Sequence, residues 1–235
     1  MTNLYDKFDF IKDKIKNKKV LDIGCVQVLH DFSPEKMKET QHYKLRSYAK
    51  QLVGIDLEEQ GVKALNELDC ECYQILAEDV SKLNLGKFDI ILLADILEHI
   101  PDPCSFLTSI KGNLTEDGII ICTLPNALCY EYQIRLLLSK PDNKHYQLGS
   151  RGQHVAWYCK VTLSNLFRYA GYKMESCSYG VFWKNNPHWY RPLFEKILFR
   201  INEEYASQIL AVFSIEKTFT DEAKIALQKS RIIGG

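Results

Sequence analysis

Short apolar runs alternate with amphipathic stretches along most of this chain. The run at 88–94 (FDIILLA) is typical of a strand buried in a sheet. The stretch at 59–68 places Val62, Leu65 and Leu68 at helical spacing, which predicts a helix with one apolar face. Strands that alternate with helices indicate a mostly parallel sheet covered by helices. Further strands are expected at 20–25, 52–56, 72–76, 119–124, 172–179 and 208–217, and further helices at 4–18, 43–51, 102–114, 130–138 and 163–170.

The regular alternation loosens after residue 125, although the length of 235 residues fits a single domain, 1–235, with insertions. The stretch 126–158 is too long for a bare connection, so we expect it to form a lid or a wall of the substrate site. The stretch 181–206 is rich in aromatic residues. It is expected either to pack beneath the late strands or to cover an acceptor, which could be lipid-linked.

The charge balance and the cysteines narrow the class of protein. The chain has 30 basic and 30 acidic residues, and zero net charge argues against a nucleic-acid binder that works through bulk charge. No apolar run is long enough to cross a membrane, and the first residues lack a signal-peptide pattern. The eight cysteines are scattered, without a CxxC pair or zinc-site spacing. We therefore expect reduced thiols, no metal site and a cytoplasmic location.

Acidic residues mark the ends of the early predicted strands. Asp22 lies inside the first strand, and Asp56, Asp79 and Asp95 come at or after the ends of the next three. Because the carboxyl ends of parallel strands meet at one edge of a sheet, these acids are expected to line one ligand site. A cradle for a dinucleotide pyrophosphate needs G-x-G-x-x-G after the first strand, and this chain has the single Gly24. A nicotinamide-dependent enzyme is therefore a weaker hypothesis.

These acids suit a ligand that combines a positive charge, a ribose and an exocyclic amine without a phosphate. Asp22 would attract the cation, and Asp56 would accept hydrogen bonds from the ribose hydroxyls. Asp79, or the neighbouring Glu78, would accept from the amine. S-adenosylmethionine has all three features and no phosphate, so it is the expected cofactor.

Five motifs resemble those of the class I S-adenosylmethionine-dependent methyltransferases: VLDIGC, VGID, AEDV, FDIILLADILEHIPDP and GIIICTLPN. The resemblance covers about residues 18–180. It implies an α/β fold with a Rossmann-like, doubly wound, seven-stranded and mostly parallel sheet whose last strand is antiparallel. The chain departs from the family pattern twice. The second glycine of the first loop is replaced in Cys25-Val26-Gln27, and a longer separation of Asp22 from Asp56 implies an inserted loop at 31–42 beside the cofactor.

The resemblance also implies roles for single residues at the cofactor. Gly24 and Asp22 would meet the methionine end, against the alternative of a turn glycine and a helix-capping acid. Asp56 would hold the ribose diol, although it could instead cap the helix at 59–68. The cofactor residues that the resemblance implies are Asp22, Gly24, Cys25, Asp56, Leu57, Asp79, Val80, Ala94 and Asp95.

The acceptor side offers fewer signals. His99 and His154 are the candidate catalytic bases, each with the alternative of a structural histidine, and Arg151 and Trp157 are candidate acceptor contacts. A subset of the family with a DIGC-x-Q start and a later H-x-x-W looks similar and often accompanies the biosynthesis of surface glycans or small molecules. We therefore expect O-methylation of a small molecule or a surface-glycan precursor. The alternatives are N-methylation of a small amine or a protein, and a non-catalytic partner subunit that retains the fold.

Overall fold

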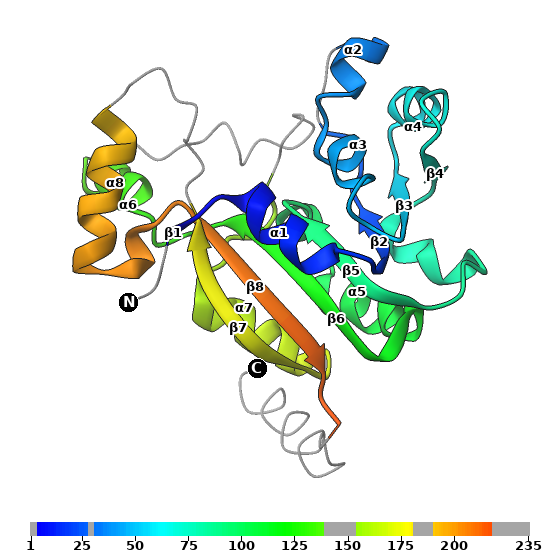
Figure 1. Cartoon of the computed structure of the whole chain (residues 1–235). Coiled ribbons are helices and arrows are strands. Elements are labelled where there is room, and N and C mark those ends of the chain that lie inside the picture. Colours follow the sequence, from blue (N-terminus) through cyan, green and yellow to red (C-terminus); the bar gives the residue numbers. More distant parts are fainter. Residues whose placement is uncertain (1–3, 28–30, 139–153, 181–189, 218–235) are drawn as a thin grey trace.

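The computed structural model describes residues 4–27, 31–138, 154–180 and 190–217, and these residues form one twisted sheet with helices on both faces (Figure 1). The strand order is β1-β7-β8-β6-β5-β2-β3-β4. Strand β8 is antiparallel to both of its neighbours, and the other pairs are parallel. The strands are β1 Leu4–Tyr5, β2 Lys19–Ile23, β3 Gln51–Asp56, β4 Glu71–Gln74, β5 Phe88–Ala94, β6 Leu114–Pro125, β7 Tyr172–Gly180 and β8 Gln208–Ile215.

The helices lie between the strands, as expected for parallel neighbours, which need a crossover connection. The α-helices are α1 Lys7–Ile15, α2 Pro34–Met37, α3 Gln41–Leu45, α4 Glu59–Asn66, α5 Pro103–Ser109, α6 Tyr130–Leu137, α7 Lys160–Tyr169 and α8 Tyr190–Ile201. Short 3₁₀ helices add η1 Ala77–Lys82, η2 Leu97–His99, η3 Ile110–Asn113 and η5 Glu203–Tyr205.

Each central strand sends alternate side chains into two separate cores, because successive side chains of a strand point to opposite faces. Val20 and Leu92 pack with Ile11 of α1 on one face. Leu21 and Leu93 pack on the other face with α5 and α7. Burial on both faces explains why these strands read as continuous apolar runs. A buried acid on such a strand, such as Asp22, then needs a partner inside the protein.

The expected α/β fold with a mostly parallel sheet and an antiparallel last strand is confirmed, with two local corrections. Residues 4–18 are not one helix: Leu4–Tyr5 form an additional strand beside β7. Helix α1 begins only at Lys7, because the Asp6 side chain accepts a hydrogen bond from the Asp9 N–H at 3.1 Å and caps it. The predicted insertion 31–42 is not a plain loop, since it holds α2 and the first turn of α3.

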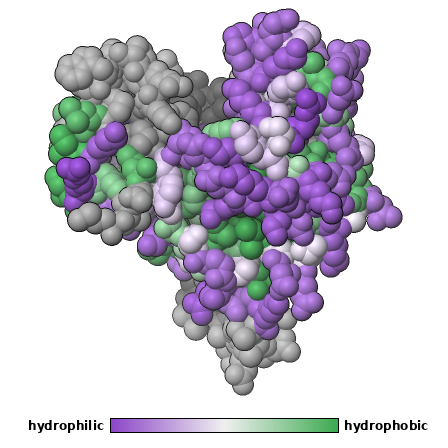
Figure 2. Space-filling view, in the orientation of Figure 1, coloured by the Kyte–Doolittle hydropathy of each residue, from purple (hydrophilic) through white to green (hydrophobic). Residues whose placement is uncertain are grey.

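Two of the three expected insertions are only partly described, because 139–153 and 181–189 lie outside the described residues. Their described helices, α6 and α8, carry exposed apolar side chains, including Leu137 (84% exposed) and Ile201 (72%). Figure 2 shows hydrophobic residues over α8, in contrast to the hydrophilic surface over α1 and α2. Among the described helices, none is long and apolar enough to cross a membrane.

Candidate cofactor and acceptor site

The loop that follows β2 turns sharply at Gly24 and lies against β3. Gly24 has φ +81°, a left-handed conformation that favours glycine. The N–H groups of Gly24 and Cys25 both donate to the carbonyl of Ile55, at 2.9 and 3.1 Å. A Cβ on Gly24 would lie 3.0 Å from Ile96, in the segment that follows β5. The loop therefore approaches both strands that neighbour β2.

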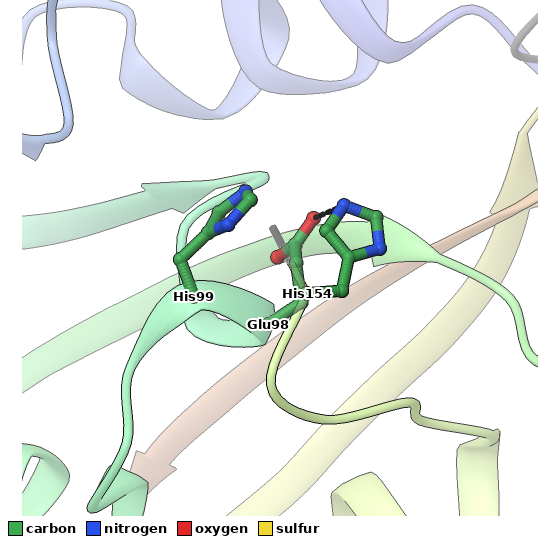
Figure 3. A group of neighbouring side chains, drawn as sticks. All are labelled: Glu98, His99 and His154. Carbon is green, nitrogen blue, oxygen red and sulfur yellow. Dashed lines mark ion pairs between the residues drawn. The ribbon is translucent and has the colours of Figure 1, made fainter. Parts of the chain in front are cut away.

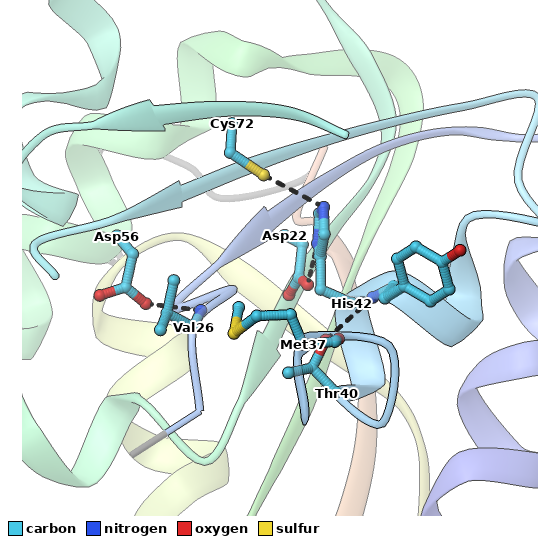
Figure 4. Close-up of polar contacts among 8 residues, drawn as sticks. Asp22, Val26, Met37, Thr40, His42, Asp56 and Cys72 are labelled. Carbon is cyan, nitrogen blue, oxygen red and sulfur yellow. Dashed lines mark hydrogen bonds and ion pairs between the residues drawn. The ribbon is translucent and has the colours of Figure 1, made fainter. Parts of the chain in front are cut away.

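Asp56 ends β3 beside this loop, and two backbone N–H groups hold its carboxylate. The Val26 N–H donates to Oδ2 at 2.8 Å (Figure 4). The Glu58 N–H donates to Oδ1 at 3.0 Å. Burial raises the pKa of Asp56 above its ordinary value, and the backbone hydrogen bonds act in the opposite direction. Each carboxylate oxygen keeps further acceptor capacity. Asp56 is thus fixed in place and able to accept hydrogen bonds from two adjacent hydroxyls, which fits the ribose of S-adenosylmethionine.

Asp22 has a protein partner that the sequence did not suggest. Its side chain is buried, and Oδ2 lies 2.8 Å from Nδ1 of His42 (Figure 4). Nε2 of His42 lies 3.4 Å from the sulfur of Cys72. Burial acts to lower the pKa of His42, but the hydrogen bonds to Asp22 and Cys72 outweigh it and raise the pKa to about 9. The carboxylate of Asp22 is therefore paired with an imidazolium, and its contact with the cofactor ammonium stays a prediction.

His42 reaches this position because α3 begins just before it. Thr40 caps the helix by accepting a hydrogen bond from the Tyr43 N–H at 3.3 Å. The helix then buries His42 and Leu45 on its inner face, at the spacing of one helical turn. A histidine at the end of a polar stretch carries no sequence signal for such a role. The inserted segment 31–42 thereby becomes attached to the buried acid of β2.

The other predicted cofactor residues differ in what their side chains can reach. Leu57 is 59% exposed after β3, whereas the side chains of Cys25 and Val80 are buried, so these two could meet a ligand only through their backbone. Asp79 lies in η1, with Oδ1 2.7 Å from Nζ of Lys82. The contact of Asp79 with adenine stays a prediction.

Asp95 follows Ala94 at the end of β5. It is hydrogen-bonded to Thr123 of β6 and forms an ion pair with Lys7 of α1. Its backbone has φ +55°, an uncommon value for a residue with a side chain. Its N–H donates to the Thr123 carbonyl at 2.8 Å, and the Thr123 hydroxyl donates to Oδ1 at 3.2 Å. Nζ of Lys7 lies 2.6 Å from Oδ2. Helix α1 therefore reaches the edge of the sheet at which the acids gather, a contact that the sequence pattern did not predict.

Glu98 and His99 follow Asp95 along the chain, in η2, and His154 comes from a distant segment. The three side chains form a compact group (Figure 3). The two imidazole rings are 4.9 Å apart, and Nε2 of His154 lies 4.0 Å from Oε1 of Glu98. The N–H groups of Val155 and Ala156 donate to the Glu98 carbonyl, at 2.8 and 3.3 Å. These backbone bonds attach the His154 segment to η2. The structure thus brings together the two histidines that the sequence proposed separately.

Glu98 is the member of this group that sequence reasoning missed. Its carboxyl is buried, and Oε2 has no hydrogen-bond partner in the described part of the chain. Burial, and then repulsion from Asp95, raises the pKa of Glu98 to about 8, although Lys7 acts to lower it. An acid beside His99 inside an apolar motif was a signal that could have identified it. A carboxyl that titrates near neutral pH beside an imidazole is suited to proton transfer.

Of the two predicted acceptor contacts, only Trp157 lies within the described residues. Its ring centroid lies 5.6 Å from that of His154 and 4.3 Å from that of Tyr132. Arg151 lies in 139–153, outside the described residues. Trp157 therefore belongs to an aromatic group that packs against the histidine cluster.

Comparisons with known proteins bear on the family of this chain and on its fold. A family model described as "Methyltransferase domain" matches residues 4–176. A ubiquinone biosynthesis O-methyltransferase of Haemophilus ducreyi is 27% identical over 200 residues, which cover 77% of this chain and 80% of that protein. Its counterpart in Glaesserella parasuis is 29% identical over 141 residues, but there the match spans only about half of each protein, 54% of this chain and 55% of the relative.

Solved structures show the same fold. An S-adenosylmethionine-dependent methyltransferase of Mesorhizobium loti aligns with a TM-score of 0.56 at 13% identity, over 85% of this chain and 91% of that one. Another from Archaeoglobus fulgidus aligns with a TM-score of 0.54 at 16% identity, over 88% and 94%. Because the family model covers well over half of the chain, the chain belongs to the S-adenosylmethionine-dependent methyltransferases of class I, and S-adenosylmethionine is its cofactor.

Proposed function

We propose that this chain methylates a hydroxyl group of a small molecule, with His154 taking up the proton of that hydroxyl and Glu98 stabilising the protonated His154. The observation that carries the proposal is the group formed by the buried Glu98 and the half-buried His99 and His154 beyond the end of β5. A Cβ on Gly24 would touch Ile96, two residues before Glu98. The group therefore lies next to the loop at which the methionine end of the cofactor is expected.

The residues proposed to hold the cofactor come from three neighbouring strands. Asp56 would accept hydrogen bonds from the ribose hydroxyls, and the backbone of the loop at Gly24 would hold the methionine end. Asp79 would bind the adenine amine. When bound, S-adenosylmethionine supplies a methyl group on a positively charged sulfur. The protein then has to orient the acceptor and remove its proton, because a neutral hydroxyl is a weak nucleophile.

His154 is the proposed base because Glu98 can stabilise its protonated form. One nitrogen of His154, Nε2, faces Oε1 of Glu98, and the other would take the proton of the acceptor hydroxyl (Figure 3). An ionised Glu98 would stabilise the imidazolium, while a protonated Glu98 would not. Since the pKa of Glu98 is about 8, the rate should rise with pH through this value. Trp157 would form part of the acceptor wall beside His154.

The acceptor class rests on the relatives, several of which are named ubiquinone biosynthesis O-methyltransferases. Their name supports a small molecule as acceptor and oxygen as the methylated atom. A surface-glycan precursor, a small amine and a non-catalytic role remain the alternatives. A second candidate mechanism follows from the same three side chains, whose ligand atoms lie within 4.8 Å of one another. Two imidazoles and a carboxylate could hold a divalent cation that activates the acceptor hydroxyl.

The test combines cofactor binding with an acceptor panel. Binding of S-adenosylhomocysteine is measured by calorimetry, and formation of that product is followed with phenols, sugars and matched amines. We expect binding, methylation of a hydroxyl, and a loss of about 10²–10⁴ in turnover for His154→Gln with unchanged cofactor affinity. His99→Gln, the neighbouring imidazole, is the comparison that separates the two bases.

Three other outcomes would each contradict one part of this proposal. Methylation of amines alone would replace O-methylation by N-methylation. Absence of S-adenosylhomocysteine binding would favour the non-catalytic alternative. Loss of turnover on treatment with EDTA, restored by Mg²⁺ or Zn²⁺, would favour the metal-assisted mechanism over base catalysis by His154.

A further inference from the structure

A second group of side chains, two thiols and an imidazole, lies at the loop 24–26, the cofactor loop, and the proposed chemistry does not use it. Gly54 of β3 leaves a gap between its neighbours on β2 and β4, because its register partners are Asp22 and Cys72. A Cβ on Gly54 would lie 2.7 Å from the sulfur of Cys25, 2.8 Å from that of Cys72 and 2.8 Å from Cε1 of His42. The two thiols and the imidazole therefore converge on one point over a residue without a side chain.

The hydrogen bonds of this group favour a thiolate on Cys72. Asp22 accepts from Nδ1 of His42, and Nε2 of His42 faces the Cys72 sulfur at 3.4 Å. The sulfur of Cys25 borders the same gap, 2.7 Å from the position of a Cβ on Gly54. The nearby thiol of Cys25, together with the imidazole of His42, lowers the pKa of Cys72 to about 6 against the effect of burial. A thiolate with an imidazolium on one side and a thiol on the other is the arrangement of a reactive cysteine with a resolving partner.

We propose that Cys25 and Cys72 form a redox-active pair that closes a disulfide when a hydroperoxide oxidises the protein, and that this disulfide weakens cofactor binding. Both cysteines are unpaired in the structure and buried. A small oxidant is therefore required, and it would enter through local opening of the loop. The disulfide itself does not depend on the proposed function, whereas its effect on binding rests on the assignment of the cofactor loop.

The reaction proceeds in two balanced steps. With hydrogen peroxide as the oxidant, the Cys72 thiolate attacks one peroxide oxygen, the O–O bond breaks, and the leaving hydroxide takes a proton from His42 to become water. The Cys25 sulfur then displaces hydroxide from the sulfenic acid on Cys72. The S–S bond forms, the S–O bond breaks, and the proton of Cys25 leaves with the hydroxide as water. The peroxide is reduced by two electrons, and each sulfur is oxidised by one.

Closure must move the cofactor loop, because a disulfide needs sulfurs about 2.05 Å apart, closer than any hydrogen bond permits. Cys25 follows Gly24 and precedes Val26, whose N–H holds the carboxylate of Asp56 at 2.8 Å. Pulling Cys25 toward β4 displaces both neighbours. Oxidation also removes the thiolate that receives the second N–H of His42. Both changes act on residues that line the expected cofactor site.

The test compares reduced protein with protein treated with hydrogen peroxide. We expect the oxidised chain to lose two hydrogen atoms by intact mass, and non-reducing peptide mapping to join Cys25 to Cys72. We expect its affinity for S-adenosylhomocysteine to fall by about tenfold, equivalent to about 1.4 kcal/mol, and to recover with dithiothreitol. Cys25→Ser and Cys72→Ser should each abolish the mass change, whereas Cys104→Ser, on α5, should retain it.

The possible negative results would overturn different parts of the proposal. A disulfide of Cys72 with Cys70, or oxidation without a 25–72 linkage, would overturn the pair, and mapping of the wild-type protein shows this even if a variant does not fold. A 25–72 disulfide that leaves affinity unchanged would overturn the coupling to the cofactor. If the reduced protein does not bind S-adenosylhomocysteine at all, the proposed function fails while the disulfide is still tested by mass.

Discussion

Replacing the buried Glu98 by glutamine is expected to stabilise the protein at neutral pH while impairing turnover. The pKa of Glu98 is about 8 in the folded protein, against an ordinary value of 4.5. Between these values the folded state holds a proton that the unfolded state has released. The free energy of unfolding therefore falls as pH rises, by about 1.4 kcal/mol per unit. From pH 4.5 to pH 7 the loss is roughly 3 kcal/mol, and it ends near pH 8.

Glu98→Gln keeps the size of the side chain and removes this titration. The gain in the free energy of unfolding over the wild type should be below about 1 kcal/mol at pH 5 and reach about 3 kcal/mol at pH 7. Urea unfolding at pH 5, 6, 7 and 8 measures the difference, with the exposed Glu67→Gln as the control that should show none. A difference between Glu98→Gln and the wild type that does not change with pH would refute the reasoning. Turnover should fall, since the amide cannot become the anion that stabilises protonated His154.

Three further predictions, one with a matched control, concern the proposed cofactor site, the packing beneath it and the Glu98 group. Asp56→Asn should weaken S-adenosylhomocysteine binding by about tenfold or more, measured by calorimetry, and unchanged affinity would refute the ribose assignment. Gly54→Ala should destabilise the fold by about 1–3 kcal/mol in urea unfolding, because its Cβ would overlap two sulfurs and an imidazole. Gly112→Ala should leave the free energy of unfolding unchanged, because nothing lies within 4 Å of its Cβ. Equal effects of the two substitutions would contradict the packing argument. Lys7→Met should shift the rise of kcat to higher pH, since Lys7 lowers the pKa of Glu98; an unmoved pH–rate profile would exclude this coupling.

The fold was predictable because its signals are local. The strand at 88–94 was expected with the bounds that the structure has, since a continuous apolar run between polar residues is what burial on both faces requires. The error at 4–18 has an equally local cause. Leu4 and Tyr5 extend the apolar spacing of α1, but the cap at Asp6 separates them from the helix.

The site was predictable only in part. The ends of parallel strands meet at one edge, so the sequence could propose that Gly24, Asp56 and Asp95 share a site. It could not show that Asp22 would be paired with His42, because that contact depends on the cap that starts α3 and on the gap above Gly54.

The sequence by itself determined the class of fold and the family, and it proposed the edge of the sheet that would hold the cofactor, because each depends on periodicity and on short motifs at strand ends. Only the tertiary structure decided which side chains lie together. Glu98 meets His154 because two backbone N–H groups of a distant segment bond to its carbonyl. Cys25 meets Cys72 because a glycine on the strand between them leaves room for both sulfurs. Such contacts depend on packing between segments far apart in the chain, and packing has no period that a sequence can display.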